Sequence, residues 1–211
     1  EKGLLDIGSY CVCFETAKLL PWNFDYFVPF TTTNLETNWA VKHKILKQFP
    51  YLTKMLEDKY NQKFIAMQGF DDYGLGTVKQ WQKASELKGV KVIAAGPNLP
   101  WVSLFGSIPV TSTLPTMYND LATGVAKGVI IFPSAHAGGF KFYEQAPYWK
   151  VIGFGAMAQT ITTINLDTLK KLPPEVAKII MEEAQNYEKA AVKDGQQRYQ
   201  KGLTDLVKLG K

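Results

Sequence analysis

The end of the sequence predicts one very long helix, and this helix constrains the fold more than any other feature. At 1.5 Å per residue, a helix over residues 175–209 is roughly 50 Å long, which exceeds the diameter of a small domain. It must therefore span two domains, and Gly195 and Gly202 are the points where we expect it to bend or break. Pro173 or Pro174 opens it, because proline fits the first turn of a helix. Its apolar stripe consists of Val176, Ile179, Ile180, Ala184, Tyr187, Ala191, Leu203, Leu206 and Val207.

Residues 87–101, LKGVKVIAAGPNLPW, predict the lip of a ligand cleft. Val90–Ala95 is typical of a short buried strand, the segment 96–98 is a Gly-Pro-Asn turn, and Trp101 follows at once. Gly96 allows close backbone approach, and the proline fixes the path of the chain. An ordinary loop with a core tryptophan explains the same pattern equally well.

The residues from Thr113 to Phe132 extend the stretch 87–101 into an α/β unit. Thr113 is a suitable N-cap, Gly124 stops the helix, and Val129–Phe132 is a short apolar run that predicts a buried strand. A strand, turn, helix and strand in this order gather loops at one edge of a sheet, where open α/β sheets bind ligands.

Four motifs in this order resemble the periplasmic solute-binding proteins of TRAP transporters, of the DctP type. They are Gly3-Leu-Leu-Asp-Ile-Gly8, Val28-Pro-Phe30, the LKGVKV…G stretch with its following helix, and Lys171-Leu-Pro-Pro-Glu-Val176. The resemblance covers essentially all 211 residues. It implies an α/β, bilobal fold like that of periplasmic binding proteins, with two α/β domains joined by hinge strands and a long C-terminal helix. It also implies that a family strand–helix–strand unit before residue 1 and the family's extreme C-terminus are missing from this chain.

The resemblance implies a domain division and a function. Residues 1–68 plus about 155–175 would form domain I, residues 69–154 domain II, and residues 175–209 the helix that spans both. Such a protein is expected to be a periplasmic monomer that captures an organic acid between its lobes and delivers it to a membrane-embedded TRAP permease. No catalysis, cofactor or metal is expected, and this chain carries no signal peptide. An effector-sensing domain of a regulator has the same shape and stays open as an alternative.

Composition excludes several other classes. A hydrophobic content of 46% and a charged content of 20% are typical of globular proteins, and no apolar run is long enough to span a membrane. The net charge of +5 comes from scattered lysines, so the footprint of a nucleic-acid-binding protein is missing. Cys11 and Cys13 lie in an apparent strand, which would point them to opposite faces, so we expect no disulfide between them.

The remaining segments have simpler predictions. Strands are expected over 6–14, 64–67 and, as one extended strand, 151–164; helices are expected over 33–49, 52–59 and 140–148. We expect a flexible loop over 134–139 and a short connection over 78–88. His43, between two lysines, is expected to be exposed, and Asp71 and Asp72 to form a solvated turn rather than a cation site.

Aromatic side chains dominate the predicted ligand site. Trp101, Phe132, Tyr73 and Phe30 would surround a flat apolar ligand, because aromatic rings stack or meet edge-on with a planar body. The acid group would bind Asn98, Ser134, His136, Lys91 or the backbone N–H groups of the turn at Gly96. His136 would also be the residue to test if the chain were an enzyme.

The resemblance places an arginine that grips a carboxylate at the position of Ile93. The chain's only arginine, Arg198, is expected to lie far away on the last helix. We therefore expect an aromatic or hydrophobic monocarboxylate of the benzoate, phenylacetate or cinnamate type. A small cyclic or 2-oxo acid is the alternative ligand.

Overall fold

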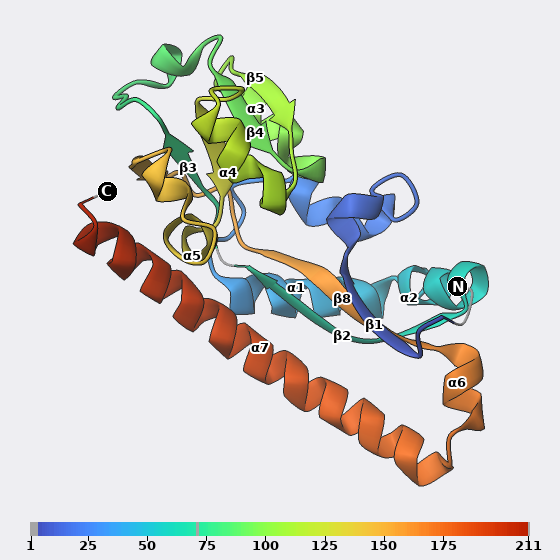
Figure 1. Ribbon diagram of the computed structural model, residues 1–211. Coiled ribbons are helices and arrows are strands. Elements are labelled where there is room, and N and C mark those ends of the chain that lie inside the picture. Colours follow the sequence, from blue (N-terminus) through green and yellow to red (C-terminus); the bar gives the residue numbers. More distant parts are fainter. Residues whose placement is uncertain (1–3, 71, 211) are drawn as a thin grey trace.

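The computed structural model describes residues 4–70 and 72–210, which form two α/β lobes with one long helix running along both (Figure 1). The first lobe is built on a three-stranded antiparallel sheet in the order β1-β8-β2. Its strands are β1 (Ile7–Cys11), β2 (Gln62–Phe70) and β8 (Met157–Asn165). Helices α1 (Leu35–Gln48) and α2 (Tyr51–Tyr60) pack against this sheet, and the 3-10 helices η1 (Val12–Glu15) and η2 (Leu20–Phe27) precede them.

The second lobe has a five-stranded mixed sheet in the order β5-β4-β6-β3-β7. Strand β4 (Lys91–Ala94) is parallel to β5 (Ile108–Thr111) and to the central strand β6 (Gly128–Ile131), and β3 (Gly74–Thr77) is antiparallel to β6 and β7 (Tyr148–Val151). Three helices and three 3-10 helices connect these strands: α3 (Leu99–Ser103), α4 (Leu114–Ala122), α5 (Pro133–Ala137), η3 (Ala84–Leu87), η4 (Gly96–Asn98) and η5 (Phe142–Glu144).

Strand β8 is buried along nearly its whole length because both faces of the first sheet are covered. On one face Ile161 packs with Leu46 and Leu56 of α1 and α2, and on the other Ile164 packs with Ala184 of the long helix. Helix α1 begins where the side-chain oxygen of Asn34 accepts a 2.8 Å hydrogen bond from the Thr37 N–H. The chain passes between the lobes twice, from β2 to β3 and from β7 to β8.

The long helix α7 (Pro174–Lys208) follows the short α6 (Leu166–Lys171), and it is continuous through both glycines. The expectation of a bend or break there is wrong, because both glycines are buried at close helix contacts instead. A Cβ on Gly195 would lie 2.6 Å from a methyl of Leu35, and one on Gly202 would lie 2.6 Å from the backbone nitrogen of Ser134. Glycine therefore lets α7 approach α1 in the first lobe and α5 in the second.

Several predictions in the second lobe are wrong. Residues 134–139 do not form a flexible loop, because α5 occupies the start of this segment, and only the short η5 replaces the helix expected over 140–148. The predicted strand 151–164 is divided: β7 ends at Val151, and β8 begins at Met157 after a turn in which Gly153 has φ +79° and Gly155 φ +121°. Strands β3 and β5 lack a run of large apolar residues, which explains why the sequence did not predict them.

The prediction for the two cysteines is also wrong. Cys11 and Cys13 form a disulfide, with their Cα atoms 5.2 Å apart. The strand ends at Cys11 and a 3-10 helix begins at Val12, so the alternation of a strand no longer separates the two side chains.

Two charged positions are less exposed than the sequence suggests. His43 is only partly exposed, and its Nε2 lies 3.0 Å from a carboxylate oxygen of Glu188 on α7. Asp72 is buried, and its carboxylate accepts a 2.9 Å hydrogen bond from the backbone of Gly155, so the solvated turn is wrong at this residue. Burial raises the pKa of Asp72, while hydrogen bonds from the Gly155 and Gly153 backbones act in the opposite direction. Asp71 and the Gly3 that opens the first family motif lie outside the described residues.

Candidate functional site

Four of the predicted site residues meet in one aromatic cluster, defined by Phe30, Phe70, Tyr73, Trp101, Phe132 and Phe154. Tyr73 lies edge-on to both Trp101 and Phe132, with ring centroids 5.8 and 5.7 Å apart. Trp101 stacks on Phe154 at 4.9 Å, and Phe154 in turn contacts Phe30 at 5.7 Å. The rings fill the space between one another, and Phe30 is the exposed member at 55%.

Trp101 connects the aromatic cluster to the first lobe. Its indole Nε1 donates a 2.9 Å hydrogen bond to the backbone carbonyl of Tyr26 in η2. The Tyr26 ring also lies 5.7 Å from the Trp101 ring, and both residues are buried. The core of the second lobe therefore continues into a segment of the first lobe at this point.

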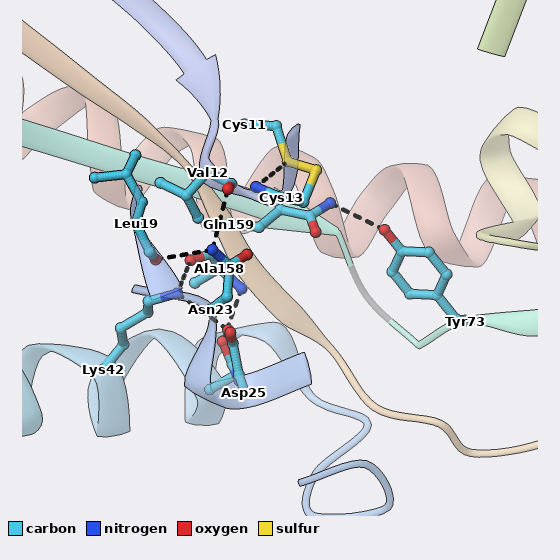
Figure 2. A network of polar contacts seen from close by, with 11 residues as sticks. Cys11, Val12, Cys13, Leu19, Asn23, Asp25, Lys42, Tyr73, Ala158 and Gln159 are labelled. Carbon is cyan, nitrogen blue, oxygen red and sulfur yellow. Dashed lines mark hydrogen bonds and ion pairs between the residues drawn. A yellow bond between two sulfur atoms is a disulfide. The ribbon is translucent and has the colours of Figure 1, made fainter. Parts of the chain in front are cut away.

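A buried polar network begins where Tyr73 meets strand β8 (Figure 2). The side-chain amide of Gln159 donates a 2.9 Å hydrogen bond to the Tyr73 hydroxyl. Deeper in the first lobe, the Lys42 ammonium donates to Asp25 at 3.1 Å and to the carbonyl of Ala158 at 2.6 Å. Gln159 follows Ala158 directly, so one strand carries both parts of the network.

Three oxygen atoms of this network lack a hydrogen-bond partner within the described residues. They are Oδ1 of Asn23, Oδ1 of Asp25 and Oε1 of Gln159, and all three residues are at least nine-tenths buried. The Asn23 amide nitrogen is fully used, since it donates to the carbonyls of Val12 and Leu19. Buried acceptors without partners are costly, so these oxygens are suited to receive N–H or O–H donors.

The two tyrosines of the junction are held neutral. Burial raises the pKa of Tyr26 well above its ordinary value, and the neighbouring Tyr73 raises it further. Burial also raises the pKa of Tyr73, against the opposing effect of hydrogen bonds with Tyr26 and Gln159. At neutral pH both hydroxyls therefore keep their protons.

Gly96 and Asn98 lie beside this junction in η4. Gly96 has φ +59°, and a Cβ there would lie 2.6 Å from the carbonyl oxygen of Cys13. The close approach that the sequence predicted at Gly96 is thus made by the backbone of the first lobe. Asn98 is buried, and its side-chain oxygen accepts a 2.9 Å hydrogen bond from the Ala95 N–H, which closes the turn.

His136 is separated from the aromatic cluster. It is fully buried, its Nε2 lies 3.0 Å from the carbonyl of Ala146, and its ring packs 4.6 Å from Trp149. Burial lowers the pKa of His136 to about 4, against a smaller opposing effect of the Ala146 carbonyl. The expectation that this histidine lies on a loop reaching the cleft is wrong, because α5 holds it against Gly76 of β3.

Arg198 lies closer to the predicted site than the sequence suggests. Its guanidinium carbon lies 5.5 Å from the centre of the Phe70 ring, which stacks on Phe132 at 3.9 Å. Ser134, which is partly buried, and Arg198 border the same small cavity of about 10 Å³, which is too small for an organic acid. Arg198 is paired with Asp194 at 2.7 Å. Expecting Arg198 far from Phe132 was therefore wrong.

Two further positions from the sequence analysis, Ile93 and Lys91, lie away from the aromatic cluster. Ile93 is fully buried in the centre of the second sheet, so the position that the family resemblance assigns to arginine is part of the core here. Lys91 is the first residue of β4, at the opposite end of the strand from the turn at Gly96. It cannot contribute to a site at that turn.

Sequence reasoning missed Gln159, Tyr26 and Phe154 as site residues. Gln159 had a usable signal, since it is a polar residue in an apolar run that the sequence assigned to a buried strand. Phe154 had none, because only the turn around Gly153 and Gly155 places it against Trp101.

The described residues contain no group of three or more His, Cys, Asp or Glu side chains arranged to hold a metal ion. Within the same part of the chain, no helix combines the length and apolar character that crossing a membrane requires.

Crossing strands and a long helix join two α/β lobes, and aromatic and buried polar residues of both lobes meet between them. This arrangement defines a bilobal solute-binding fold. The chain belongs to the bacterial extracellular solute-binding proteins, family 7 (DctP), whose family profile matches residues 14–210. The predicted family and fold class are thereby confirmed.

Solved structures of this family share the fold. DctP7 of Bordetella pertussis, an extracytoplasmic solute receptor binding pyroglutamic acid, has a TM-score of 0.84 at 19% identity, covering 98% of this chain and 67% of that one. A TRAP periplasmic solute-binding protein from Pseudomonas putida F1 with bound D-glucuronate has a TM-score of 0.82 at 16% identity, covering 99% and 67%. A marine metagenome TRAP protein specific for pyroglutamate has a TM-score of 0.77 at 19% identity, covering 97% and 65%. The chain thus spans about two thirds of the length of these structures. No curated protein matches it.

Proposed function

We propose that this protein is the periplasmic solute-binding component of a TRAP transporter, which captures a small organic acid between its lobes and delivers it to a membrane permease. Residues 1–68 with about 155–175 would move as one body and residues 69–154 as the other, with α7 bracing both. Domain closure around a ligand is a common way for two-lobed proteins to bind. The protein would act as a monomer and bind its ligand without converting it.

The observation that carries this proposal is the contact between the lobes. Where the chain passes from lobe to lobe, the Trp101 indole donates to the backbone carbonyl of Tyr26, and the Gln159 side chain donates to the Tyr73 hydroxyl. Residues of both lobes that meet at this junction are well placed to enclose a ligand.

Two classes of acid have support from different features of the site. The aromatic cluster favours an aromatic or hydrophobic monocarboxylate, because its exposed member Phe30 offers a ring for stacking. The unpartnered Oε1 of Gln159 favours a small cyclic acid that carries an N–H or O–H donor. The pyroglutamate bound by two of the related structures is an acid of this second class.

A thermal-shift panel with native mass spectrometry tests the proposal. Phenylacetate and benzoate represent the first class, pyroglutamate and glucuronate the second, and succinate serves as an aliphatic dicarboxylate. A ligand present at about 100 times its Kd should stabilise the folded protein by about 2.7 kcal/mol, which is readily seen as a higher Tm. A shift by succinate alone, or no shift by any acid, would contradict the proposal.

A matched pair of variants locates the site. Gln159→Leu removes the buried acceptor and the hydrogen bond to the Tyr73 hydroxyl. Gln145→Leu is the control: it removes a bond of the same kind elsewhere, in the second lobe, where the Gln145 amide donates to the Tyr118 hydroxyl at 3.0 Å. We expect binding of a donor-bearing acid to weaken in the first variant and to be unchanged in the second. Equal effects would place the ligand elsewhere.

A further inference from the structure

The second lobe has a cavity of about 700 Å³ at the end of its sheet that is opposite the aromatic cluster. The residues around it include Lys79, Lys91 and Lys127, together with Trp81 and Glu86. In Figure 1 the green loop that follows β3 lies at the end of the second lobe remote from β8. Strands β4 and β6 are parallel, and their carboxyl ends lead toward Gly96 and Phe132, while Lys91 and Lys127 stand at their amino ends. The cavity is therefore separate from the candidate site between the lobes.

Backbone hydrogen bonds join the segments that carry the three lysines: Lys91 begins β4, Lys127 directly precedes β6, and Lys79 lies two residues after the end of β3. The Lys127 N–H donates to the Lys91 carbonyl at 2.8 Å, and the Val78 N–H donates to the Lys127 carbonyl at 2.9 Å. Adjacent strands are about 4.8 Å apart, so the backbones of Lys91, Lys127 and Val78, the residue before Lys79, follow one another within roughly 10 Å across β4, β6 and β3. The sheet, rather than flexible loops alone, holds these positive charges together.

These charges are not neutralised by protein carboxylates. In the described part of the chain, none of the three lysines has a salt bridge. Glu86 is the one acid among the described lining residues, and its Oε1 already accepts hydrogen bonds from the N–H groups of Gln82 and Lys83. Like charges held close together repel, and this repulsion is relieved when an anion binds between them.

The wall of the cavity includes one aromatic ring, and a fourth cation from outside the lining residues packs on that ring. Trp81 is 8% exposed, and its indole Nε1 lacks a hydrogen-bond partner among the described residues. The ammonium of Lys150 lies 4.6 Å from the centre of the Trp81 ring. Lys150 comes from β7, so a further strand contributes positive charge beside the three lysines.

We propose that this lysine cavity binds a small multivalent oxyanion, one that carries at least two carboxylate or phosphate groups. Three ammonium groups in a concave site suit several negative oxygens at once, and the volume lies within the range of small-molecule sites, about 300 to 1,000 Å³. This ligand differs from the monocarboxylates proposed for the site between the lobes. The two sites can therefore be tested separately.

Isothermal titration calorimetry with inorganic pyrophosphate and with citrate tests the lysine cavity. We expect one binding event per chain, with affinity that falls as salt is raised from about 20 mM to about 200 mM. The variant Lys79→Gln/Lys91→Gln/Lys127→Gln should bind at least about tenfold more weakly. All three positions are exposed, so folding is expected to be retained and is checked by circular dichroism.

A charge-matched control separates a specific site from general attraction. Lys189→Gln/Lys193→Gln/Lys208→Gln removes the same charge from exposed positions on α7 and should change the affinity by less than about twofold. Equal weakening in both triple variants, or no binding to the unmodified protein at low salt, would overturn the proposal.

Tryptophan fluorescence gives a second readout: the anion should alter the signal of the unmodified protein and not that of Trp81→Phe. The same change in both would also contradict the site.

Discussion

The indole of Trp101 donates its hydrogen bond to the backbone of Tyr26, 75 residues earlier in the chain. Trp101 is in α3 of the second lobe, and Tyr26 is in η2 of the first. Nearby, Gly96 of η4 lies against the carbonyl of Cys13 in η1, so the two lobes meet at a second point. A tryptophan that the sequence places at the edge of a cleft is thus also the residue that connects the lobes in this structure.

Replacing Trp101 should therefore lower the free energy of unfolding, by less with phenylalanine than with alanine. Trp101→Phe keeps an aromatic ring but leaves the buried Tyr26 carbonyl without its donor, and we expect the free energy of unfolding to fall by about 1–3 kcal/mol. Trp101→Ala also opens a cavity beside Phe154 and should cost about 3–5 kcal/mol. Urea unfolding followed by circular dichroism measures both. A Trp101→Phe protein as stable as the unmodified one would show that the bond contributes nothing.

The buried pair of Lys42 and Asp25 should be sensitive to loss of one partner. Both side chains are almost fully buried, so Lys42→Met leaves the Asp25 carboxylate unpaired and should cost about 3–5 kcal/mol in urea unfolding. Lys54→Met is the control, because Lys54 and Asp58 form an exposed pair one helical turn apart whose loss should hardly change the stability. The double variant Lys42→Met/Asp25→Leu should recover part of the loss. Similar losses in both single variants would refute the buried-pair argument.

The two glycines of α7 should differ in their response to alanine. Alanine at 202 would place a Cβ 2.6–2.9 Å from the backbone of Pro133 and Ser134, which cannot move freely, so Gly202→Ala should destabilise by about 1–3 kcal/mol. At 195 the nearest atom is a side-chain methyl of Leu35, which can rotate away, and we expect a smaller loss. Thermal unfolding ranks the two, with the exposed Gln197→Ala as a near-neutral control. If Gly202→Ala raised the Tm, as alanine does at an exposed position of a helix, this would contradict the close contact between α7 and α5.

His136 should make the stability depend on pH. Burial lowers its pKa from 6.5 to about 4 in the folded protein, so between these values the unfolded chain binds more protons. Stability is therefore unaffected by this group above pH 6.5 and falls as the pH is lowered toward 4, by up to about 3 kcal/mol in total. His136→Gln, which does not titrate, should show a shallower slope over this window in urea unfolding at several pH values. Parallel slopes for the two proteins would mean that His136 is not held neutral by burial.

Much of the fold follows from patterns that are local in the sequence. The stripe from Val176 to Val207 predicted α7, since a helical repeat over so many residues has no competing interpretation. Thr113 and Gly124 correctly bounded α4 to within a residue or two, because capping depends on the neighbouring backbone alone. The short strands β3 and β5 were not predicted, because Gly74–Thr77 and Ile108–Thr111 are extended only through their pairing with neighbouring strands.

In the candidate site, too, the sequence predicted some residues correctly and misplaced others. The sequence identified Trp101, Tyr73, Phe132 and Phe30 by type, and the structure brings them into one cluster. His136 was misplaced because Gly76 leaves room for its ring on the far side of α5, a contact between residues 60 positions apart. Arg198 was misplaced because the register of α7 against Phe70 depends on the close packing at Gly195 and Gly202.

The sequence by itself determined the family, the bilobal α/β class and the helix that spans both lobes, since helix periodicity, caps and turn motifs are encoded within a few residues. Only the tertiary structure decided which polar groups lose contact with water. It closed the Cys11–Cys13 disulfide, buried Lys42 beside Asp25, left the Gln159 oxygen without a hydrogen-bond partner among the described residues, and gathered three lysines at one end of the second sheet. The physical reason is that burial and electrostatic environment depend on long-range packing, which no local pattern specifies.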